Sequence, residues 1–317
     1  RKKKKTIYSM PVSIFNFGIK KMKWKSKVLA YATIVFNFLL IISYLAFLSD
    51  PAKNTWIALA GLLYPAILFL NLVLFLIWFF KRNIYFLPTL IIIILGMYHH
   101  SRFIQLNPKI SSNISYKDKL KVMSFNVRLF DLYNWKKNEE IKSKIIALIK
   151  DQKPDIVCLQ EYFYDNNKKF ITRENILEEL SFKYYHESFS SESNKNSMFG
   201  LATFSKYPII NKEKIEFNDE KSNHCMWSDI VFKKDTLRVF NAHLGSIRFN
   251  YSDYKIIGGK GRPIRSNQKK PKQNIINKLK IGFKNRSIQL KKLIPVIEIS
   301  PFKKIICCDL NDTPISY

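Results

Sequence analysis

The sequence predicts a group of transmembrane helices followed by an α/β or α+β domain. Long uncharged apolar runs occupy the first hundred residues, and short strand-like and helix-like patterns alternate after residue 117. The charges divide in the same way, because residues 1–116 hold 15 Lys and Arg against one acid, whereas residues 117–317 hold 38 against 23. A content of 47% hydrophobic and 15% aromatic residues excludes a disordered chain.

Three apolar runs precede residue 107. Val28–Leu48 and Trp56–Phe80 carry no charge and have the roughly 20 residues that a helix needs to cross the hydrocarbon core. Ile84–Tyr98 is shorter and reaches that length only with the residues that follow it. Runs of this length and spacing disfavour a soluble core helix and a cleaved signal peptide. We predict a membrane domain, residues 28–106, with about three transmembrane helices: 28–48, 56–80 and 84–104.

The flanking charges predict an orientation. Residues 1–27 form a basic N-terminus with ten Lys and Arg, and the loops 49–55 and 81–83 hold one and two. The positive-inside rule places this N-terminus in the cytoplasm. Three spans then put the second domain outside the cytoplasm, and two spans would reverse that. The prediction is an integral protein of the inner or plasma membrane, with the lipid bilayer as a partner and the polar segment 107–117 as a linker.

The second domain, residues 118–317, begins with a strand-like pattern and alternates thereafter. A helix is predicted over 138–152, because its isoleucines and leucine share one face, and another over 286–299, with Pro295 as a candidate kink. Strands are predicted over 120–128, 155–161, 200–205, 224–232, 236–243 and 303–309.

Four of these strands end in polar residues that apolar patterning does not explain. Side chains alternate along a strand, so each of three pairs can share a face: Asn126 with Arg128, Asn241 with His243, and Asp309 with Asn311. Glu161 ends a fourth strand. Adjacent strands that end together would collect these amides, carboxylates and imidazole in one cleft.

Such a set suits metal-assisted cleavage of a phosphoester. Mg²⁺ takes few protein oxygens and keeps several waters, so Glu161 and Asn126 would suffice as ligands. Asp309 can deprotonate a water, and His243 can donate a proton to a phosphoryl oxygen or leaving group. Asn311 can bind a phosphate oxygen. Taken singly, each residue also has an ordinary interpretation as a turn residue, a solvated strand end or a structural histidine.

Five motifs in this order resemble the endonuclease/exonuclease/phosphatase superfamily, the DNase I-like group: SFNVR (124–128), PDIVCLQE (154–161), GLATFSKYPI (200–209), NAHL (241–244) and CDLNDTP (308–314). The resemblance implies a four-layer α/β sandwich of two facing sheets with helices outside. It implies a metal site at Asn126 and Glu161, holding Mg²⁺ or alternatively Mn²⁺. It further implies that His243 is the catalytic histidine and that Asp309 and Asn311 handle the water and the phosphate.

The sequence departs from that family in two places. Cys308 stands where the family usually has Gly. The family's closing Asp-His strand is not found before Tyr317, so we expect the last strands to be missing and the chain to be a fragment truncated at its C-terminus.

A basic insertion, residues 251–285, is predicted between the NAHL strand and the following helix. Residues 251–290 hold eleven Lys and Arg against one acid. The insertion is interpreted either as a loop for an anionic substrate, with Lys260 and Arg262 as ligands, or as a solvated Lys-rich loop. Arg128 and Asn241 are the other candidate substrate-binding residues.

Two function classes follow. The first is a membrane-anchored, Mg²⁺-dependent phosphoesterase whose substrate is a phospholipid or sphingolipid head group or a nucleic acid. The alternative is a membrane-tethered binding or scaffold protein with a degenerate site, which the absent Asp-His pair favours. The sequence indicates no protein partner, and the uncharged runs disfavour a transporter.

Overall fold

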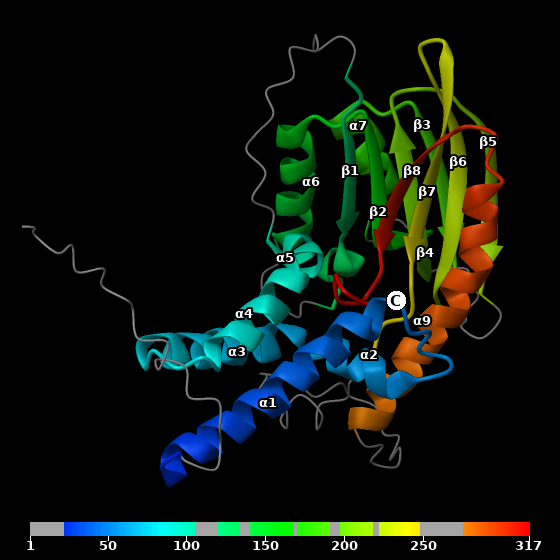
Figure 1. Ribbon diagram of the computed structural model, residues 1–317. Coiled ribbons are helices and arrows are strands. Elements are labelled where there is room, and N and C mark those ends of the chain that lie inside the picture. The colour runs from blue at the N-terminus through cyan, green and yellow to red at the C-terminus, as the bar shows by residue number, and fades with distance from the viewer. Residues whose placement is uncertain are drawn as a thin grey trace, which may run out of the picture. The chain divides into compact units, whose positions relative to one another are not determined.

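The computed structural model describes residues 22–104, 119–133, 140–167, 170, 172–190, 197–217, 222–247 and 275–317. The described residues form two compact units, 22–104 with 312–317, and 119–311 (Figure 1). Most of the predicted basic N-terminus and the predicted linker 107–117 lie outside the described residues.

The first unit is helical: α1 (Trp24–Tyr44) continues into η3 (Leu45–Phe47), and α2 (Thr55–Leu62), α3 (Tyr64–Phe80), α4 (Phe86–Leu95) and α5 (Met97–Phe103) follow. Among the described residues, Trp24–Phe47 is the one helix that is long and apolar enough to cross a membrane by itself. The predicted span 56–80 is bent by 59° between α2 and α3, and a second crossing exists only if this bent pair counts as one.

The predicted third span, 84–104, is divided into two short helices. The helix α4 has ten residues and ends at Gly96, after which α5 begins. A Cβ atom at Gly96 would lie 2.1 Å from the Tyr44 hydroxyl oxygen, so the close approach of α1 requires glycine here. The apolar run in the sequence does not reveal this break, because glycine is compatible with a membrane helix.

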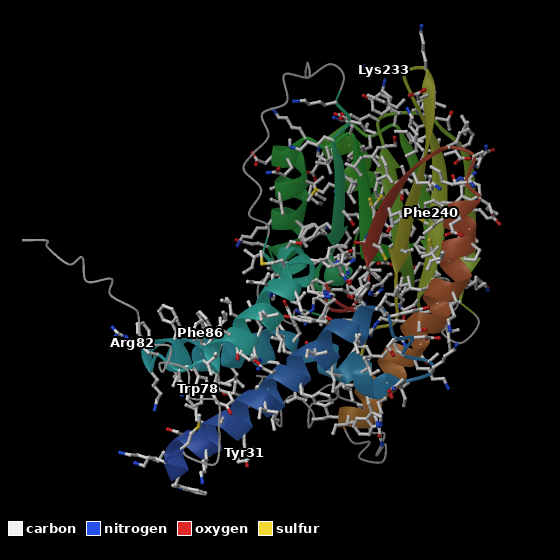
Figure 2. The ribbon with its side chains drawn as sticks, viewed as in Figure 1. Tyr31, Trp78, Arg82, Phe86, Lys233 and Phe240 are labelled. Carbon is white, nitrogen blue, oxygen red and sulfur yellow. The ribbon has the colours of Figure 1, made fainter. Side chains whose placement is uncertain are left out.

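Several polar side chains of the helical unit are buried and hydrogen-bonded. Trp78 donates its indole N–H to Thr33 Oγ1 at 2.8 Å, and Asn37 donates to Thr89 Oγ1 at 3.2 Å. Asn71 is fully buried and donates to two main-chain carbonyls. Figure 2 shows Tyr31, Trp78 and Phe86 on these helices. Many exposed side chains of the same helices are large and apolar, among them Ile34, Phe38, Phe69, Leu76, Phe79 and Ile91.

The second unit contains two four-stranded sheets. The first has the order β1-β2-β4-β3, with β1 (Val122–Asn126), β2 (Ile156–Asp165), β3 (Tyr184–Phe189) and β4 (Ser197–Ser205). The second has the order β5-β6-β7-β8, with β5 (Ile209–Glu216), β6 (His224–Phe232), β7 (Asp235–His243) and β8 (Lys303–Asp309). The pairs β1/β2 and β7/β8 are parallel, and the other pairs are antiparallel.

Helices cover the outer face of each sheet. Ile149 of α6 (Ile141–Gln152) and Ile176 of α7 (Arg173–Leu180) pack on residues of the first sheet. Leu293 of α9 (Ile275–Glu298) packs on Phe240 and its neighbours in the second sheet. A further cluster lies between the sheets and contains Ile156, Cys158, Ile230, Val239 and Cys307. The four-layer arrangement that the resemblance implies is therefore present.

The six predicted strands are all present, whereas α7, β3 and β5 were not predicted. The predicted limits of the basic insertion and of the last helix are wrong, because α9 begins at Ile275 and includes residues 275–285. Lysines and Gly282 weaken the apolar pattern of that first part. Gly282 is nevertheless required, since a Cβ atom there would lie 2.8 Å from Ile247 Cγ1.

Two buried histidines connect the facing sheets. His186 of β3 contacts Ser228 Oγ of β6 at 3.0 Å, and His224 of β6 donates to the Ser188 carbonyl of β3 at 3.0 Å. Burial, with a smaller effect of a nearby lysine, lowers the pKa of each imidazole from 6.5 to about 4. Both imidazoles therefore stay neutral in the folded sandwich where the unfolded chain is protonated.

We expect the sandwich to lose stability as the pH falls from about 6.5 to 4. The unfolded chain binds protons in this range and the folded one does not, so each histidine lowers the free energy of unfolding by up to about 3 kcal/mol. The measurement is the urea concentration at the midpoint of unfolding as a function of pH. Unfolding is monitored by the reaction of the buried Cys158 and Cys225 thiols with dithiodipyridine. The double variant His186→Gln/His224→Gln should show a flatter pH dependence. An equally steep dependence in the variant would contradict the assignment.

Candidate active site

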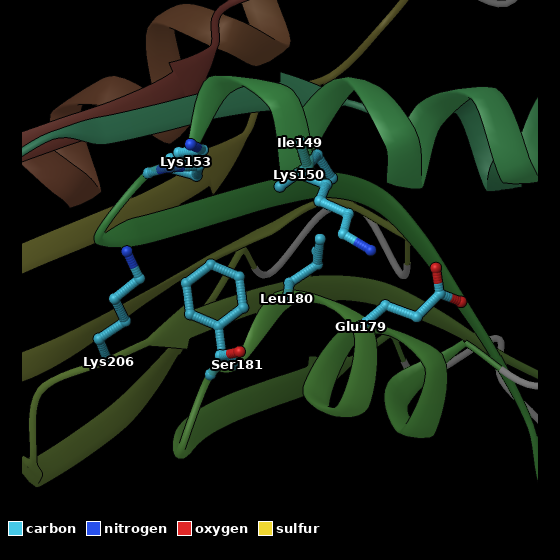
Figure 3. A pocket seen from close by; sticks show the side chains of 9 residues that line it. Ile149, Lys150, Lys153, Glu179, Leu180, Ser181 and Lys206 are labelled. Atoms are coloured by element: carbon cyan, nitrogen blue, oxygen red, sulfur yellow. The ribbon is translucent and has the colours of Figure 1, made fainter.

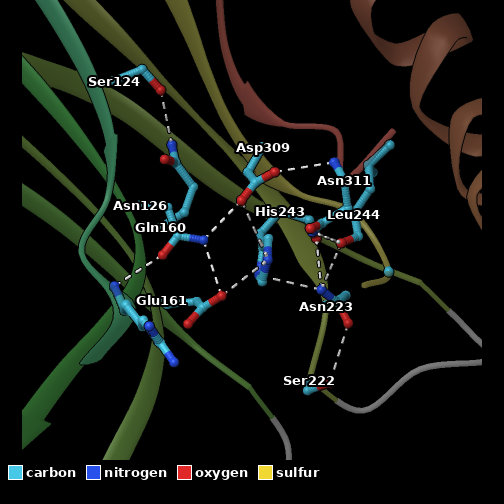
Figure 4. A network of polar contacts seen from close by, with 12 residues as sticks. Ser124, Asn126, Gln160, Glu161, Ser222, Asn223, His243, Leu244, Asp309 and Asn311 are labelled. Atoms are coloured by element: carbon cyan, nitrogen blue, oxygen red, sulfur yellow. Dashed lines mark hydrogen bonds and ion pairs between the residues drawn. The ribbon is translucent and has the colours of Figure 1, made fainter. Parts of the chain in front are cut away.

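Four strands bring polar side chains to one edge of the sandwich. Asn126 ends β1 and Glu161 lies in the adjacent strand β2 of the first sheet, whereas His243 ends β7 and Asp309 ends β8 of the second. His243 and Asp309 are register partners in the parallel pair β7/β8. Figure 4 shows the four side chains pointing toward one another. The structure thus brings together the four residues to which the sequence analysis assigns the central chemistry.

A β-bulge directs Glu161 into this group. Leu159 pairs with Ala202 and Tyr162 pairs with Gly200, so two residues of β2 oppose one residue of β4. Glu161 is the extra residue of the bulge and has a left-handed φ of 49°. The packing under α6 and α7 agrees with the bulge. Leu159 and Tyr162 would lie on opposite faces of a regular strand because they are three positions apart, yet both belong to one core cluster. Without the bulge, strand alternation would turn Glu161 away from Asp309.

Asn126 joins the two carboxylates. Its amide nitrogen donates to Glu161 Oε1 at 3.0 Å and to Asp309 Oδ2 at 2.8 Å. Its amide oxygen accepts the Arg128 N–H at 2.9 Å. Arg128 begins a run of four consecutive left-handed residues, 128–131, with φ between 47° and 57°. Such strained backbone persists where the surrounding structure enforces it and is frequent at functional sites.

His243 faces the same two carboxylates. Its Nε2 atom lies 3.7 Å from Glu161 Oε1 and 3.9 Å from Asp309 Oδ2, which is too far for a hydrogen bond. Nε2 is buried and has no hydrogen-bond partner among the described residues. A buried polar atom without a partner is rare, so this one indicates a group that the active site would bind.

Asn223 fixes the other side of the imidazole. Its amide nitrogen lies 3.3 Å from His243 Nδ1, and it also donates to the carbonyls of His243 and Leu244 at 3.2 and 3.1 Å. Because the two carbonyls orient the amide with its hydrogens toward His243, Nδ1 is the acceptor. The proton of the neutral ring is then on Nε2, which faces the carboxylates.

The other candidate residues have different surroundings. Asn311 contacts the site through its main-chain N–H, which Asp309 Oδ1 accepts at 3.0 Å, and its side chain donates to the Leu244 carbonyl at 2.9 Å. The Arg128 side chain is exposed. Lys260 and Arg262 lie outside the described residues. The phosphate and substrate roles of these four residues stay predictions.

The substrate role assigned to Asn241 is corrected by the structure. Its side chain is 0% exposed, accepts from Gln160 Nε2 at 2.8 Å and donates to the Ala202 carbonyl at 3.0 Å. Strand alternation places Asn241 on the same face as His243, as expected, but that face lies between the sheets. Asn241 therefore ties the two sheets together and does not reach a substrate.

The sequence analysis did not find four supporting residues. Gln160 and Asn223 have the contacts described above. Arg286 Nη1 donates to the Gly245 carbonyl at 3.1 Å, and Gln289 Oε1 accepts the Gly245 N–H at 2.9 Å. These two α9 side chains hold the loop two residues after His243. A hint of them exists in the sequence, since Arg286 and Gln289 are polar residues on the buried face of an amphipathic helix.

The donor set of the site fits a hard divalent cation. Two carboxylates converge on one neutral amide donor, which has no positive charge to offset a negative charge on them. Mg²⁺ prefers one or two carboxylates and keeps its remaining positions for water or substrate. The described residues contain no group of three or more His, Cys, Asp or Glu that would enclose a metal. Glu161, with Asp309 beside it, would hold the cation, and the ligand role of Asn126 stays a prediction because its oxygen faces Arg128.

A separate hollow lies near the beginning of β2. It has a volume of about 280 Å³ and is lined by the C-terminal parts of α6 and α7, with Lys150, Lys153 and Lys206 at its rim (Figure 3). Pro154 in its wall precedes β2, whereas Glu161 lies well along that strand. The hollow contains none of the four polar strand-end residues and is distinct from the candidate active site.

Two family models match separate parts of the chain. The model of the "Endonuclease/Exonuclease/phosphatase family" matches residues 123–275, which include Asn126, Glu161 and His243. Asp309 and Asn311 lie beyond the end of this match. The helical residues 26–103 match a "Domain of unknown function (DUF8431)". No curated protein matches the chain. The resemblance noted in the sequence is thus supported over the first part of the sandwich.

Solved structures of the same type resemble the chain at low identity. An endonuclease/exonuclease/phosphatase from Beutenbergia cavernae is 14% identical with a TM-score of 0.42, and the match covers 62% of this chain and 50% of that protein. A humanized D. rerio TDP2 is 16% identical with a TM-score of 0.40, and the match covers 61% of this chain and 67% of that protein. The human Nocturnin catalytic domain is 18% identical with a TM-score of 0.38, and the match covers 62% of this chain and 65% of that protein. The matched part thus spans half the length of the Beutenbergia cavernae protein.

We expect the neutral His243 ring to carry its proton on Nε2, because the Asn223 amide hydrogens face Nδ1. Nitrogen-15 NMR of the histidine-labelled protein measures the tautomer directly. Asn223→Ala should give a mixture of the two tautomers, whereas Asn211→Ala, at an exposed position of β5, should leave the ring unchanged. A proton on Nδ1 in the unsubstituted protein would contradict this assignment.

Proposed function

We propose that the chain is a membrane-anchored phosphoesterase that uses a divalent cation, Mg²⁺ in the first place, to hydrolyse a phosphodiester or phosphomonoester. The observation that carries the proposal is the convergence of Glu161 and Asp309 on one amide. The Nε2 atom of His243, which has no hydrogen-bond partner among the described residues, faces both carboxylates. The family match over residues 123–275 supports the same reaction class.

The residues of the chain have separate roles in this proposal. A cation bound at Glu161 would neutralise charge on the phosphoryl oxygens and the leaving group. Asp309 accepts a proton from the attacking water, and His243 donates from Nε2 to a phosphoryl oxygen or to the leaving group. Asn126 keeps the carboxylates together by donating to both, and the Asn311 main-chain N–H orients Asp309 by donating to its Oδ1 atom.

The membrane anchorage is supported by the distribution of side chains in the helical unit. Buried amides and hydroxyls make hydrogen bonds inside, and many of the large exposed side chains are isoleucine, leucine and phenylalanine. Helices surrounded by lipid have this distribution, because lipid removes the advantage of burying apolar side chains and leaves polar ones in need of partners. The helix Trp24–Phe47 is long enough to span a membrane, and 28% of its most apolar 18-residue stretch is buried.

A tethered enzyme meets substrates that share its surface. A phospholipid or sphingolipid head group satisfies this condition, and a nucleic acid also offers the phosphoester that the site would cleave. Turnover assays with each substrate distinguish the lipid head group from the nucleic acid. The proposed placement of the second unit outside the cytoplasm combines the charges of residues 1–27 with an odd number of crossings, and two crossings would reverse it.

We expect His243→Ala and Asp309→Ala to lower Mg²⁺-dependent hydrolysis of bis(p-nitrophenyl) phosphate by about 10²–10⁴-fold, because each removes a proton-transfer group. Glu161→Gln should weaken Mn²⁺ binding, measured by electron paramagnetic resonance. The matched control Asp235→Asn, at an exposed position of β7, should change neither quantity.

Metal binding without turnover in the unsubstituted chain would favour the scaffold alternative. Turnover of vesicle lipid without nicking of DNA, or the reverse, identifies the substrate class.

We expect Phe38→Arg to release the chain from membranes at alkaline pH, whereas the unsubstituted chain stays with the membrane pellet. Phe38 is an exposed residue near the middle of α1, and an arginine there costs about 2.5–3.5 kcal/mol during insertion. Leu148→Arg, at an exposed position of α6, is the control and should stay with the membrane. Release of the unsubstituted chain would exclude the anchorage.

A further inference from the structure

The outer face of α9 carries a row of exposed isoleucines. Ile281 and Ile288 are 47% and 38% exposed, and the exposed Pro295 continues the row at the same seven-residue spacing. Ile299, which is 77% exposed, directly follows the end of the helix at Glu298. Residues seven apart lie on one side of a helix. The opposite side of α9 packs on the second sheet through Leu293. Aligned apolar side chains on an exposed helix face are typical of a surface that contacts another apolar phase.

Lysines border this row on both sides. Lys284 and Lys291 are exposed along one edge, and Lys292 is exposed along the other. The 24-residue helix holds six Lys and Arg and one acid, Glu298. Long lysine side chains can extend from such positions to a layer of anions while the isoleucines between them enter an apolar layer.

The chemistry of the face distinguishes the partner. A nucleic acid would supply phosphates but would leave the isoleucines in water, and α9 offers no exposed aromatic ring for stacking, since its Phe283 is buried. A second copy of this face would set lysines against lysines. A bilayer with anionic lipids satisfies both features, because its phosphates lie directly above its acyl chains.

We propose that this face of α9 lies on an anionic lipid surface, with Ile281, Ile288 and Ile299 at the boundary of head groups and acyl chains and with Lys284, Lys291 and Lys292 at the phosphates. The proposal rests on the membrane anchorage proposed above, because that anchorage brings α9 close to lipid. A tether to the same bilayer raises the local lipid concentration, so a short row of isoleucines can be sufficient for contact.

The test uses the full chain in nanodiscs of phosphatidylcholine, with or without a minority of phosphatidylglycerol. An environment-sensitive dye is attached at Ile288→Cys, and the matched control carries it at Leu148→Cys on α6, an apolar position that is 44% exposed. Three of the four native cysteines are buried, which limits background labelling. The dye at position 288 should shift to the blue and be quenched by lipids with a spin label in the acyl chain, in the anionic discs only. The dye at position 148 should not respond.

A charge variant tests the lysines. Lys284→Gln/Lys291→Gln/Lys292→Gln should reduce the quenching at position 288 several-fold. The control Lys150→Gln/Lys183→Gln/Lys212→Gln removes the same charge from other exposed positions of this unit and should leave the quenching unchanged. Equal quenching by both triple variants would overturn the assignment of the lysines.

Three results would overturn the proposal as a whole. They are equal emission at position 288 in the two kinds of disc, a response to single-stranded DNA in place of lipid, and a response to protein concentration alone. Hydrolysis of soluble bis(p-nitrophenyl) phosphate, read on the same samples, tests the phosphoesterase separately. If the chain does not stay in discs, the anchorage is contradicted, and the same dye read against preformed vesicles of both compositions still tests the α9 face.

Discussion

The candidate active site depends on two carboxylates that are held together at the edge where the two sheets meet. Glu161 comes from one sheet and Asp309 from the other, and a single amide, that of Asn126, donates to both. Two negative charges that share one hydrogen-bond donor repel one another, and one neutral amide offsets only part of that repulsion. The fold must therefore supply the remaining constraint from outside the site. Left-handed residues at Glu161, Arg128 and Asn311 show where the backbone is forced to do so.

Buried polar contacts between the sheets supply that constraint. Hydrophobic packing alone is nondirectional and would permit the sheets to slide, which would separate the ends of β1 and β2 from those of β7 and β8. Gln160 bonds to Asn241 across the interior, immediately beside Glu161 in the chain. His186 and His224 make reciprocal contacts with serines of the opposite sheet. Each contact leaves a costly unsatisfied group if the sheets shift, so together they fix the alignment on which the site depends.

The strands and the central residues of the site could be predicted because both follow from local patterns. Short apolar runs identified the six strands, and polar residues at their ends identified Asn126, Glu161, His243 and Asp309. What could not be predicted depends on contacts between distant segments. The sequence does not show that strand alternation turns Asn241 inward, or that a bulge turns Glu161 toward Asp309. The same holds for Asn223, whose contact with the imidazole arises only when β6 and β7 pair. In the helical unit the break at Gly96 depends on Tyr44 of another helix.

The helix α9 connects the site to the surface of the unit. On its inner side, Arg286 and Gln289 bond to the main chain of Gly245, two residues beyond His243. On its outer side, Ile281 and Ile288 are exposed within one or two turns of those same residues. One helix therefore presents the proposed lipid-binding face on one side and holds the chain that follows His243 on the other. Lipid contact of the outer row, as proposed above, would act on the same helix whose inner side positions Gly245.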